Sequence, residues 1–187
     1  LPEHARVVII GQGGIVGASV AHHLIAEGWD DIVGLEKSAI PTDIGSTSHA
    51  SDFCYMTSHD KLNVFTSTYS REFYRSRGNY IEIGGMEVAR KGDDERMLEL
   101  QRKVASGKAF GSNAYMISAA EAKEKFPLVE EDMIQGAMWD PDAGLVTPRS
   151  QKVAGDLVDE AVASGKLNTF AYTAANKIIV ENGRAVG

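Results

Sequence analysis

Short apolar runs flank a helical stripe in the first 36 residues. Residues 6–10 form a β-branched run typical of a strand buried on both faces, and residues 31–36 predict a second one. Between them, apolar positions recur at helical spacing from Ile15 until Gly28, a suitable helix C-terminal cap. The pattern predicts strand, glycine-rich turn, helix and strand, and the second strand ends at the acid Glu36.

The turn over residues 11–17 is Gly-Gln-Gly-Gly-Ile-Val-Gly. Glycines permit a sharp turn and the approach of a pyrophosphate, which a helix N-terminus attracts. Glu36 would accept hydrogen bonds from ribose hydroxyls and repel a 2′-phosphate, so the unit favours FAD or NAD over NADP. The alternative is a plain glycine-rich turn with a solvated Glu36. Because no register satisfies the usual three-glycine fingerprint, we expect an extra residue in the turn; the partial registers are Gly11-Gly13-Gly17 and Gln12-Gly14-Gly17.

The remaining pattern alternates helix and strand. A helix capped by Asp60 carries an apolar stripe that we interpret as core-facing, formed by Leu62, Phe65, Tyr69 and Phe73. Two strands are expected within 79–90, joined at Gly84-Gly85, and a charged helix follows from Asp93 or Asp94 through Val104, with Met97, Leu100 and Val104 turned inward. The Ser118–Glu121 capping box opens another helix, residues 140–144 form a loop, and a helix runs from a Thr147 cap to Gly165. Strands over 168–173 and 177–181 precede a hairpin turn at Asn182-Gly183.

Composition narrows the class of protein. The 187 residues are 43% hydrophobic and 24% charged, as in a globular protein, and a net charge of −7 disfavours nucleic acid as a partner. No apolar run of bilayer length and no leader-like segment is present, so we expect a cytoplasmic protein without a membrane partner. The single cysteine, Cys54, cannot form an internal disulfide, and no zinc-site spacing occurs, so no metal site is expected.

Residues 45–50, Gly-Ser-Thr-Ser-His-Ala, lie in a turn-rich stretch after the second strand. This motif resembles that of the dimethylglycine oxidase and sarcosine or dimethylglycine dehydrogenase family of FAD-dependent amine oxidoreductases. Landmarks of the same family follow in order at 84–89, 95–111, 126–127 and 183–187. The chain departs from the family at Ser51-Asp52, where Ala or Pro followed by Gly is common, and this change is expected to alter the loop over the flavin.

The resemblance implies an α/β, Rossmann-like FAD/NAD(P)-binding three-layer fold with part of an α+β substrate domain. Residues 1–77 are expected to form the first part of the FAD-binding domain, 78–147 part of the substrate domain, and 148–187 the continued, C-terminally truncated FAD-binding domain. Because the chain stops inside an expected hairpin, we expect a piece of a longer enzyme that binds FAD weakly or not at all alone. No catalytic residue is assigned, since the substrate-facing side chains of the family lie mostly beyond the equivalent of Gly187.

In the family, the histidine of this motif carries FAD covalently, and His49 inherits that role by resemblance. The bond would join an imidazole nitrogen to the 8α-methyl carbon of the flavin. From the residues alone, an unreacted loop or core histidine is the alternative. The residues expected to bind FAD are Gly11, Gly13, Gly14, Ile15, Val16, Gly17, Glu36, Lys37, Gly45, Ser46, Thr47, Ser48, His49, Phe53 and Ala175.

The implied reaction oxidises the N-methyl C–N bond of a small amino acid such as dimethylglycine or sarcosine. A hydride equivalent would pass to the flavin and leave an iminium ion, which water hydrolyses or which tetrahydrofolate captures on a domain absent from this chain. Two alternatives stay open, an NAD-dependent dehydrogenase and a non-catalytic regulatory relative of the flavin family.

Overall fold

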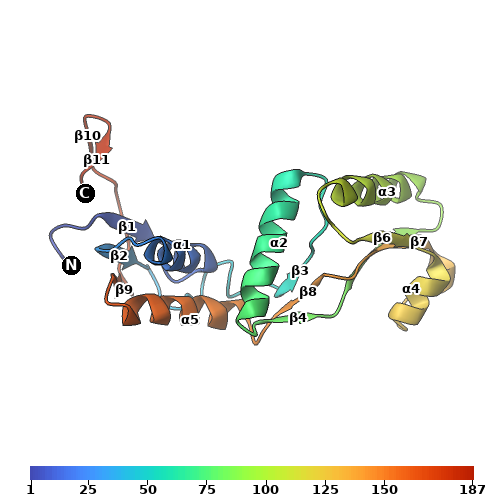
Figure 1. Cartoon of the computed structure of the whole chain (residues 1–187), viewed down its shortest axis with the longest axis horizontal. Coiled ribbons are helices and arrows are strands. Elements are labelled where there is room, and N and C mark those ends of the chain that lie inside the picture. The colour runs from blue at the N-terminus through green and yellow to red at the C-terminus, as the bar shows by residue number, and fades with distance from the viewer. The chain divides into compact units, whose positions relative to one another are not determined.

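The computed structural model describes all 187 residues, and the chain divides into two compact units (Figure 1). The first unit contains residues 1–51 and 148–187, and the second contains residues 52–147. Residues 52–77, which we expected in the FAD-binding domain, lie in the second compact unit. The expected domain boundaries themselves stay a prediction.

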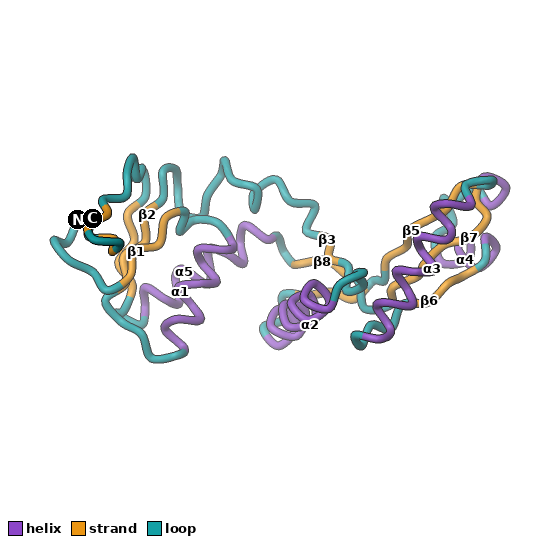
Figure 2. The backbone as a smooth tube through the Cα atoms, turned by 90° about the horizontal axis from the view of Figure 1, so that it is seen from above, coloured by secondary structure: helices purple, strands orange, loops and turns teal.

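A parallel sheet forms the centre of the first unit. Its strands are β1 (Val7–Ile10), β2 (Ile32–Leu35) and β9 (Leu167–Phe170), in the order β1-β2-β9. Helix α1 (Ile15–Ala26) connects β1 to β2, and helix α5 (Ser150–Ala163) leads into β9. The two helices pack against each other beside the sheet (Figures 1 and 2). The predicted order of strand, turn, helix and strand is confirmed, as is the α/β class.

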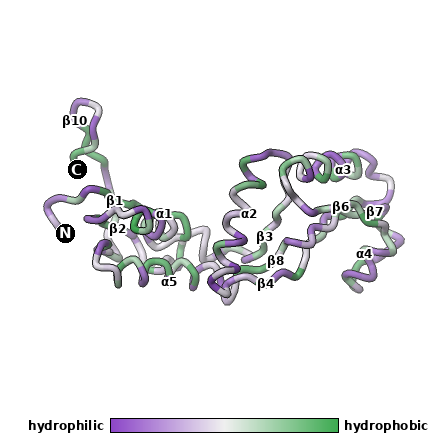
Figure 3. The backbone as a smooth tube through the Cα atoms, viewed as in Figure 1, coloured by the Kyte–Doolittle hydropathy of each residue, from purple (hydrophilic) through white to green (hydrophobic).

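Small residues allow α1 to lie close to its neighbours, because its buried positions are Gly17, Ala18 and Ala21. Helix α5 contributes larger buried side chains, and green hydrophobic positions recur along it in Figure 3. Burial of such side chains is the main favourable contribution to folding. The buried hydrophobic side chains of this unit are Ile9, Ala18, Ala21, Ile32, Val33, Val153, Ala154, Leu157, Val158, Ala161 and Leu167.

The second unit contains two antiparallel sheets. One has the order β3-β8-β4 and consists of β3 (Phe53–Cys54), β8 (Gly144–Val146) and β4 (Tyr80–Glu82); the other has the order β5-β7-β6 and consists of β5 (Gly85–Arg90), β7 (Ile134–Asp140) and β6 (Tyr115–Ile117). Its helices are α2 (Lys61–Ser76), α3 (Asp94–Ala109), α4 (Ala119–Lys125) and the 3₁₀ turn η1 (Glu131–Met133). The two strands expected within 79–90 are present but belong to different sheets.

Side-chain caps begin the helices of the second unit where the sequence predicted them. Asp60 accepts a hydrogen bond from the backbone N–H of Asn63 (2.8 Å), and Asp93 accepts one from that of Arg96 (3.0 Å). Ser118 and Glu121 form the expected capping box. The inward side of α3 is also confirmed, since its core cluster contains Leu100 and Val104 with Met97 packed against them.

The expected burial of the α2 stripe is wrong. Leu62, Phe65 and Tyr69 are 68%, 65% and 52% exposed, whereas Val64 on another side of the helix is 1% exposed. The helical period was correct, but the buried side was not. Arg71 forms ion pairs with Glu82 on a sheet strand and with Asp142 in a turn, and these pairs hold a more polar side of α2 inward. The apolar stripe contains no information about these distant partners.

The start of α5 also differs from the prediction. The helix begins at Ser150 after Arg149, and no side chain caps it. Thr147 does not cap the helix, because the N-cap position is Arg149, two residues later; the N–H of Thr147 donates to the carbonyl of Asn79 (2.9 Å) in the strand region. The predicted turn at Asn182-Gly183 is confirmed: both residues have positive φ, as a two-residue hairpin turn requires, and they join β10 (Val180–Glu181) to β11 (Arg184–Ala185).

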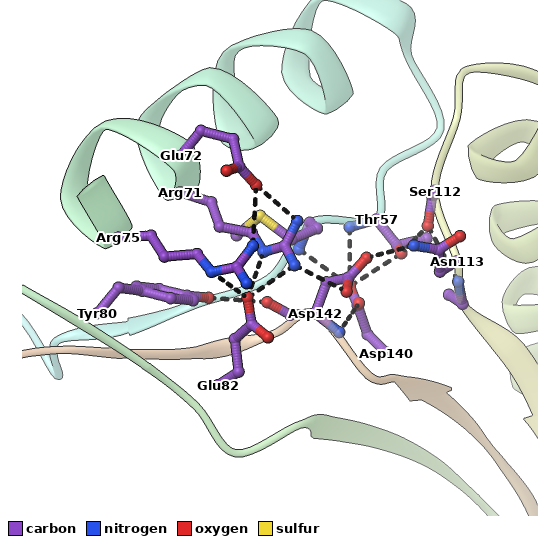
Figure 4. A network of polar contacts seen from close by, with 12 residues as sticks. Thr57, Arg71, Glu72, Arg75, Tyr80, Glu82, Ser112, Asn113, Asp140 and Asp142 are labelled. Atoms are coloured by element: carbon purple, nitrogen blue, oxygen red, sulfur yellow. Dashed lines mark hydrogen bonds and ion pairs between the residues drawn. The ribbon is translucent and has the colours of Figure 1, made fainter. Parts of the chain in front are cut away.

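A network of charged side chains fastens α2 to the sheets of the second unit (Figure 4). Arg71 donates to Glu82 on β4 (2.7 Å) and to Asp142 in the β7–β8 turn (3.0 Å). Asp140, at the end of β7, is fully buried, and its Oδ2 accepts from the backbone N–H groups of Met56 (2.9 Å) and Thr57 (3.0 Å). The carboxylate therefore ties the segment before α2 to the end of β7.

Replacement of that carboxylate is expected to destabilise the second unit. Asp140→Ala leaves the buried N–H groups of Met56 and Thr57 without an acceptor, which costs about 3 kcal/mol of the free energy of unfolding. Urea denaturation measures the loss. Asp132→Ala, at an exposed position of η1, is the control and changes the same quantity by less than about 0.5 kcal/mol. Equal stability of the two variants would contradict the structural role of Asp140.

Candidate cofactor site

A pocket of about 410 Å³ opens in the first unit at the carboxyl ends of β1 and β2. Ligands of open α/β sheets bind at this edge, beside the N-terminus of the helix that follows the first strand. The pocket is lined by Ile10, Gly11, Gly14, Leu35, Glu36, Lys37, Thr42, Ile44, Gly45, Ser46, Thr47, Thr173, Ala174 and Ala175.

The glycine-rich turn divides three tasks among three positions. Gly11 has a φ of +88°, which makes the sharp exit from β1. Gly14 is the N-cap of α1 and lines the pocket, where a side chain would stand between the backbone and a ligand. A Cβ at Gly17 would overlap the carbonyl oxygen of Gly11, so this position permits the close packing of α1 on the end of β1. Two residues separate Gly11 from Gly14, whereas the usual fingerprint has one residue between its first two glycines. This difference accounts for the expected extra residue.

Gln12 and Gly13, which lie between Gly11 and Gly14, do not line the pocket. The backbone carbonyl of Gly13 accepts from the N–H of Thr42 (2.9 Å), and a Cβ at Gly13 would crowd the same nitrogen. The side chain of Gln12 is fully buried and occupies the space that the missing side chain of Gly34 leaves. Its amide nitrogen and oxygen have no hydrogen-bond partner. Gln12 is thus a core residue, and it takes no part in lining the pocket.

Glu36 directly follows β2 and is almost fully buried. Its Oε2 accepts from the N–H of Gly13 (3.0 Å), and its Oε1 accepts from the N–H of Ser38 (3.1 Å). These bonds aim the carboxylate at the pocket that it lines. Oε1 also accepts from the hydroxyl of Ser38 (3.3 Å), whereas Oε2 has the single partner Gly13, so its second lone pair can accept a bond from a hydroxyl of a ligand.

Residues 45–49 form a compact turn beside the N-terminus of α1. Thr47 Oγ1 accepts from the N–H of Ile15, the first residue of the helix (3.0 Å). The ring of His49 is exposed, and its Nδ1 lies 3.1 Å from the carbonyl oxygen of Gly45 and 3.0 Å from Ser48 Oγ. A carbonyl only accepts, so the contact with Gly45 is a hydrogen bond in the tautomer that carries its proton on Nδ1, and in that tautomer Nε2 keeps its lone pair.

The structure brings together only part of the residue set expected from the sequence. Those that line the pocket are Gly11, Gly14, Glu36, Lys37, Gly45, Ser46, Thr47 and Ala175. Gly13, Ile15, Gly17, Ser48 and His49 support or adjoin the same turn without lining it, and Val16 is exposed on α1. Phe53 belongs to the second unit, where its ring packs edge to face on Tyr55. Whether these residues bind a cofactor stays a prediction.

Sequence reasoning missed several lining residues. Ile10 and Leu35 are the last residues of β1 and β2, so the strand ends themselves were a usable signal. Thr173 and Ala174 follow β9, and the N–H of Thr173 donates to the carbonyl of Glu36 (2.7 Å). No local sequence pattern predicts that contact, because it joins segments far apart in the sequence.

Other candidate sites offer less chemistry. A smaller pocket of about 240 Å³ in the second unit lies against α2 and includes Cys54 and Tyr74. Burial raises the pKa of the Cys54 thiol and of the Tyr74 hydroxyl, so both groups are neutral near pH 7. No cluster of three or more His, Cys, Asp or Glu side chains is placed to hold a metal ion. None of the helices combines the length and the apolar composition needed to cross a bilayer.

Comparisons with known proteins agree with this geometry. Residues 6–187 match the family model "FAD dependent oxidoreductase". Sarcosine dehydrogenase of Homo sapiens is 30% identical over 79% of the chain, and the pyruvate dehydrogenase phosphatase regulatory subunit of Mus musculus is 29% identical over 100% of it. The chain spans 16% and 21% of these two relatives.

A solved structure supports the same fold. L-Proline dehydrogenase from P. horikoshii superposes with a TM-score of 0.86 at 28% identity, over 97% of this chain and 48% of that one. The predicted Rossmann-like fold and the resemblance to sarcosine and dimethylglycine dehydrogenases are therefore confirmed. With its glycine turn, buried Glu36 and a family match over residues 6–187, this chain belongs to the FAD dependent oxidoreductase family.

Proposed function

We propose that this chain is the N-terminal FAD-binding part of an oxidoreductase that oxidises the N-methyl C–N bond of a small amino acid, such as sarcosine or dimethylglycine. The observation that carries the proposal is the pocket where Gly14, Glu36 and the turn over 45–49 meet. Bound FAD would supply the acceptor for a hydride equivalent from the N-methyl carbon. The resulting iminium ion is hydrolysed by water or captured by tetrahydrofolate on another domain.

The residues of the pocket fit the parts of FAD. The N-terminus of α1 and the bare backbone at Gly14 suit the pyrophosphate, because no Cβ stands in its way and the helix end carries partial positive charge. Glu36 suits the adenosine ribose, whose hydroxyls donate to a carboxylate already fixed by Gly13 and Ser38. Its negative charge disfavours a 2′-phosphate. The fit supports FAD and argues against NADP.

His49 is the proposed point of covalent attachment. In the tautomer whose Nδ1 donates to the carbonyl of Gly45, the Nε2 lone pair would form the bond to the 8α-methyl carbon. Attachment would break one C–H bond of the methyl group and the N–H bond of the imidazole. The two protons and two electrons released would reduce one molecule of dioxygen to hydrogen peroxide, which balances the step. Attachment through His49 rests on the resemblance of residues 45–50 and on the free lone pair.

The relatives support the choice of substrate and also a second candidate. One relative is a sarcosine dehydrogenase, and its name suggests an N-methylated amino acid as the substrate. The pyruvate dehydrogenase phosphatase regulatory subunit matches the whole chain at 29% identity, which favours a regulatory role as the alternative. The FAD dependent oxidoreductase match disfavours an NAD-dependent dehydrogenase.

Anaerobic mixing of the FAD-loaded full-length enzyme, of which this chain is a part, with substrate tests the proposal. Sarcosine or dimethylglycine is expected to bleach the yellow flavin absorbance, whereas glycine, which has the same amine and carboxylate but no N-methyl group, leaves it unchanged. A flavin-loaded protein that no N-methylated amino acid bleaches would refute the proposed reaction. A protein that carries no flavin at all after purification would favour the regulatory alternative.

A methyl group at the helix N-terminus is expected to obstruct the pyrophosphate. Gly14→Ala meets no atom closer than 3.5 Å within the chain, so its cost in stability stays below about 1 kcal/mol. FAD affinity falls at least about tenfold, measured by quenching of flavin fluorescence. The control Gly165→Ala, at the distant end of α5, leaves the affinity unchanged. Unchanged affinity in Gly14→Ala would place the pyrophosphate elsewhere.

Removal of the imidazole is expected to abolish covalent flavin without abolishing binding. His49→Ala should lose the FAD increment from the intact mass of the protein, while acid precipitation releases its flavin into the supernatant. His59→Ala is the matched control, because that exposed histidine pairs with Glu99 in the second unit. An FAD increment that survives His49→Ala would remove the assignment of the link.

A further inference from the structure

The N-terminus of α1 obtains part of its capping from a distant segment. The first four N–H groups of a helix have no partner within it, and Gly14 at the N-cap has no side chain to supply one. Thr47 fills this role for one group, since its Oγ1 accepts from the N–H of Ile15 (3.0 Å) although 32 residues separate the two. Thr47 is almost fully buried, and it lines the pocket.

Thr47 lies in the middle of a turn that is itself internally bonded. The N–H of Ser48 donates to the carbonyl of Gly45 (3.1 Å), and the N–H of His49 donates to that of Ser46 (3.2 Å). Ser48 Oγ also donates to Gly45 (2.8 Å). These bonds brace the turn internally. Two contacts hold it from outside: Arg149 donates to the carbonyl of Ser48 (3.4 Å), and Thr47 accepts from the N–H of Ile15 on α1.

The segment before this turn is held from the other side of the unit. Gln151, near the start of α5, donates from Nε2 to the carbonyl of Thr42 (2.8 Å), and Thr42 in turn donates from its N–H to Gly13 (2.9 Å). Residues 42–49 thus run between α5 and the N-terminus of α1. The anchor at Thr47 is the side-chain bond that joins the histidine turn directly to the helix end.

We propose that Thr47 is a positioning residue for the attachment of FAD to His49. Its hydroxyl fixes the turn on α1. The distance between the phosphate site at the helix end and the imidazole of His49 is thereby fixed. The inference rests on the proposed covalent link through His49. Ser46 and Ser48 do not share the role, because the Ser48 hydroxyl bonds only within the turn and the helix N–H bonds to Thr47.

Two substitutions at Thr47 separate positioning from binding. Thr47→Val keeps the volume but loses the acceptor, and Thr47→Ser keeps the acceptor. The rate of covalent incorporation is followed by intact mass after addition of FAD, and non-covalent affinity is measured with the same changes made in His49→Ala. In Thr47→Val, the factor by which the incorporation rate falls is expected to be at least about ten times the factor by which the non-covalent affinity falls. Thr47→Ser restores the rate. Thr66→Val is the control, because that hydroxyl bonds only within α2.

Three outcomes overturn the inference. They are incorporation by Thr47→Val at the wild-type rate, failure of Thr47→Ser to restore it, and losses of rate and affinity that are equal, which would make Thr47 only a binding residue. If the wild-type protein attaches no flavin, the covalent link fails, and amide hydrogen exchange then decides the positioning role alone. Faster exchange at Ile15 together with shifted ring resonances of His49 in Thr47→Val supports it, and an unchanged His49 ring refutes it.

Discussion

The close approach of α1 to the end of β1 is the constraint on which the pocket depends. It requires that Gly17 have no Cβ, since any side chain there would overlap the carbonyl of Gly11. With the helix so close, its free N–H groups face the carboxyl ends of the sheet strands. Glu36 and Thr47 then reach the same turn from two later segments, through Gly13 and Ile15. The site is assembled around one helix end.

Local signals predicted the elements of this assembly well. The glycine turn, the Asp60 and Asp93 caps and the capping box at Ser118 each depend on residues within a few positions of one another, and all were found. Even the irregular spacing of the glycines had a structural meaning, because Gln12 and Gly13 stand between Gly11 at the exit from β1 and Gly14 at the N-cap of α1. Such features follow from backbone geometry that a few neighbours decide.

Features that depend on distant segments were not predictable in this way. The apolar stripe of α2 was assigned to the core, yet Arg71 pairs with Glu82 and Asp142 and turns another side inward. The pocket wall formed by Thr173 and Ala174 exists only because β9 pairs with β2. Likewise, the sequence offered no sign that Asp140 would be buried as an acceptor for backbone groups more than 80 positions away.

The first unit is interrupted in the sequence, and this has a consequence for synthesis on the ribosome. Strand β9 cannot join β2 until residues 52–147 have been translated, so the nucleotide-binding sheet stays incomplete while the intervening segment emerges. That segment is continuous and contains its own sheets, so it is able to form first. During this interval the edge of β2 that later pairs with β9 keeps its backbone N–H and C=O groups unpaired, so the nascent sheet presents an open edge.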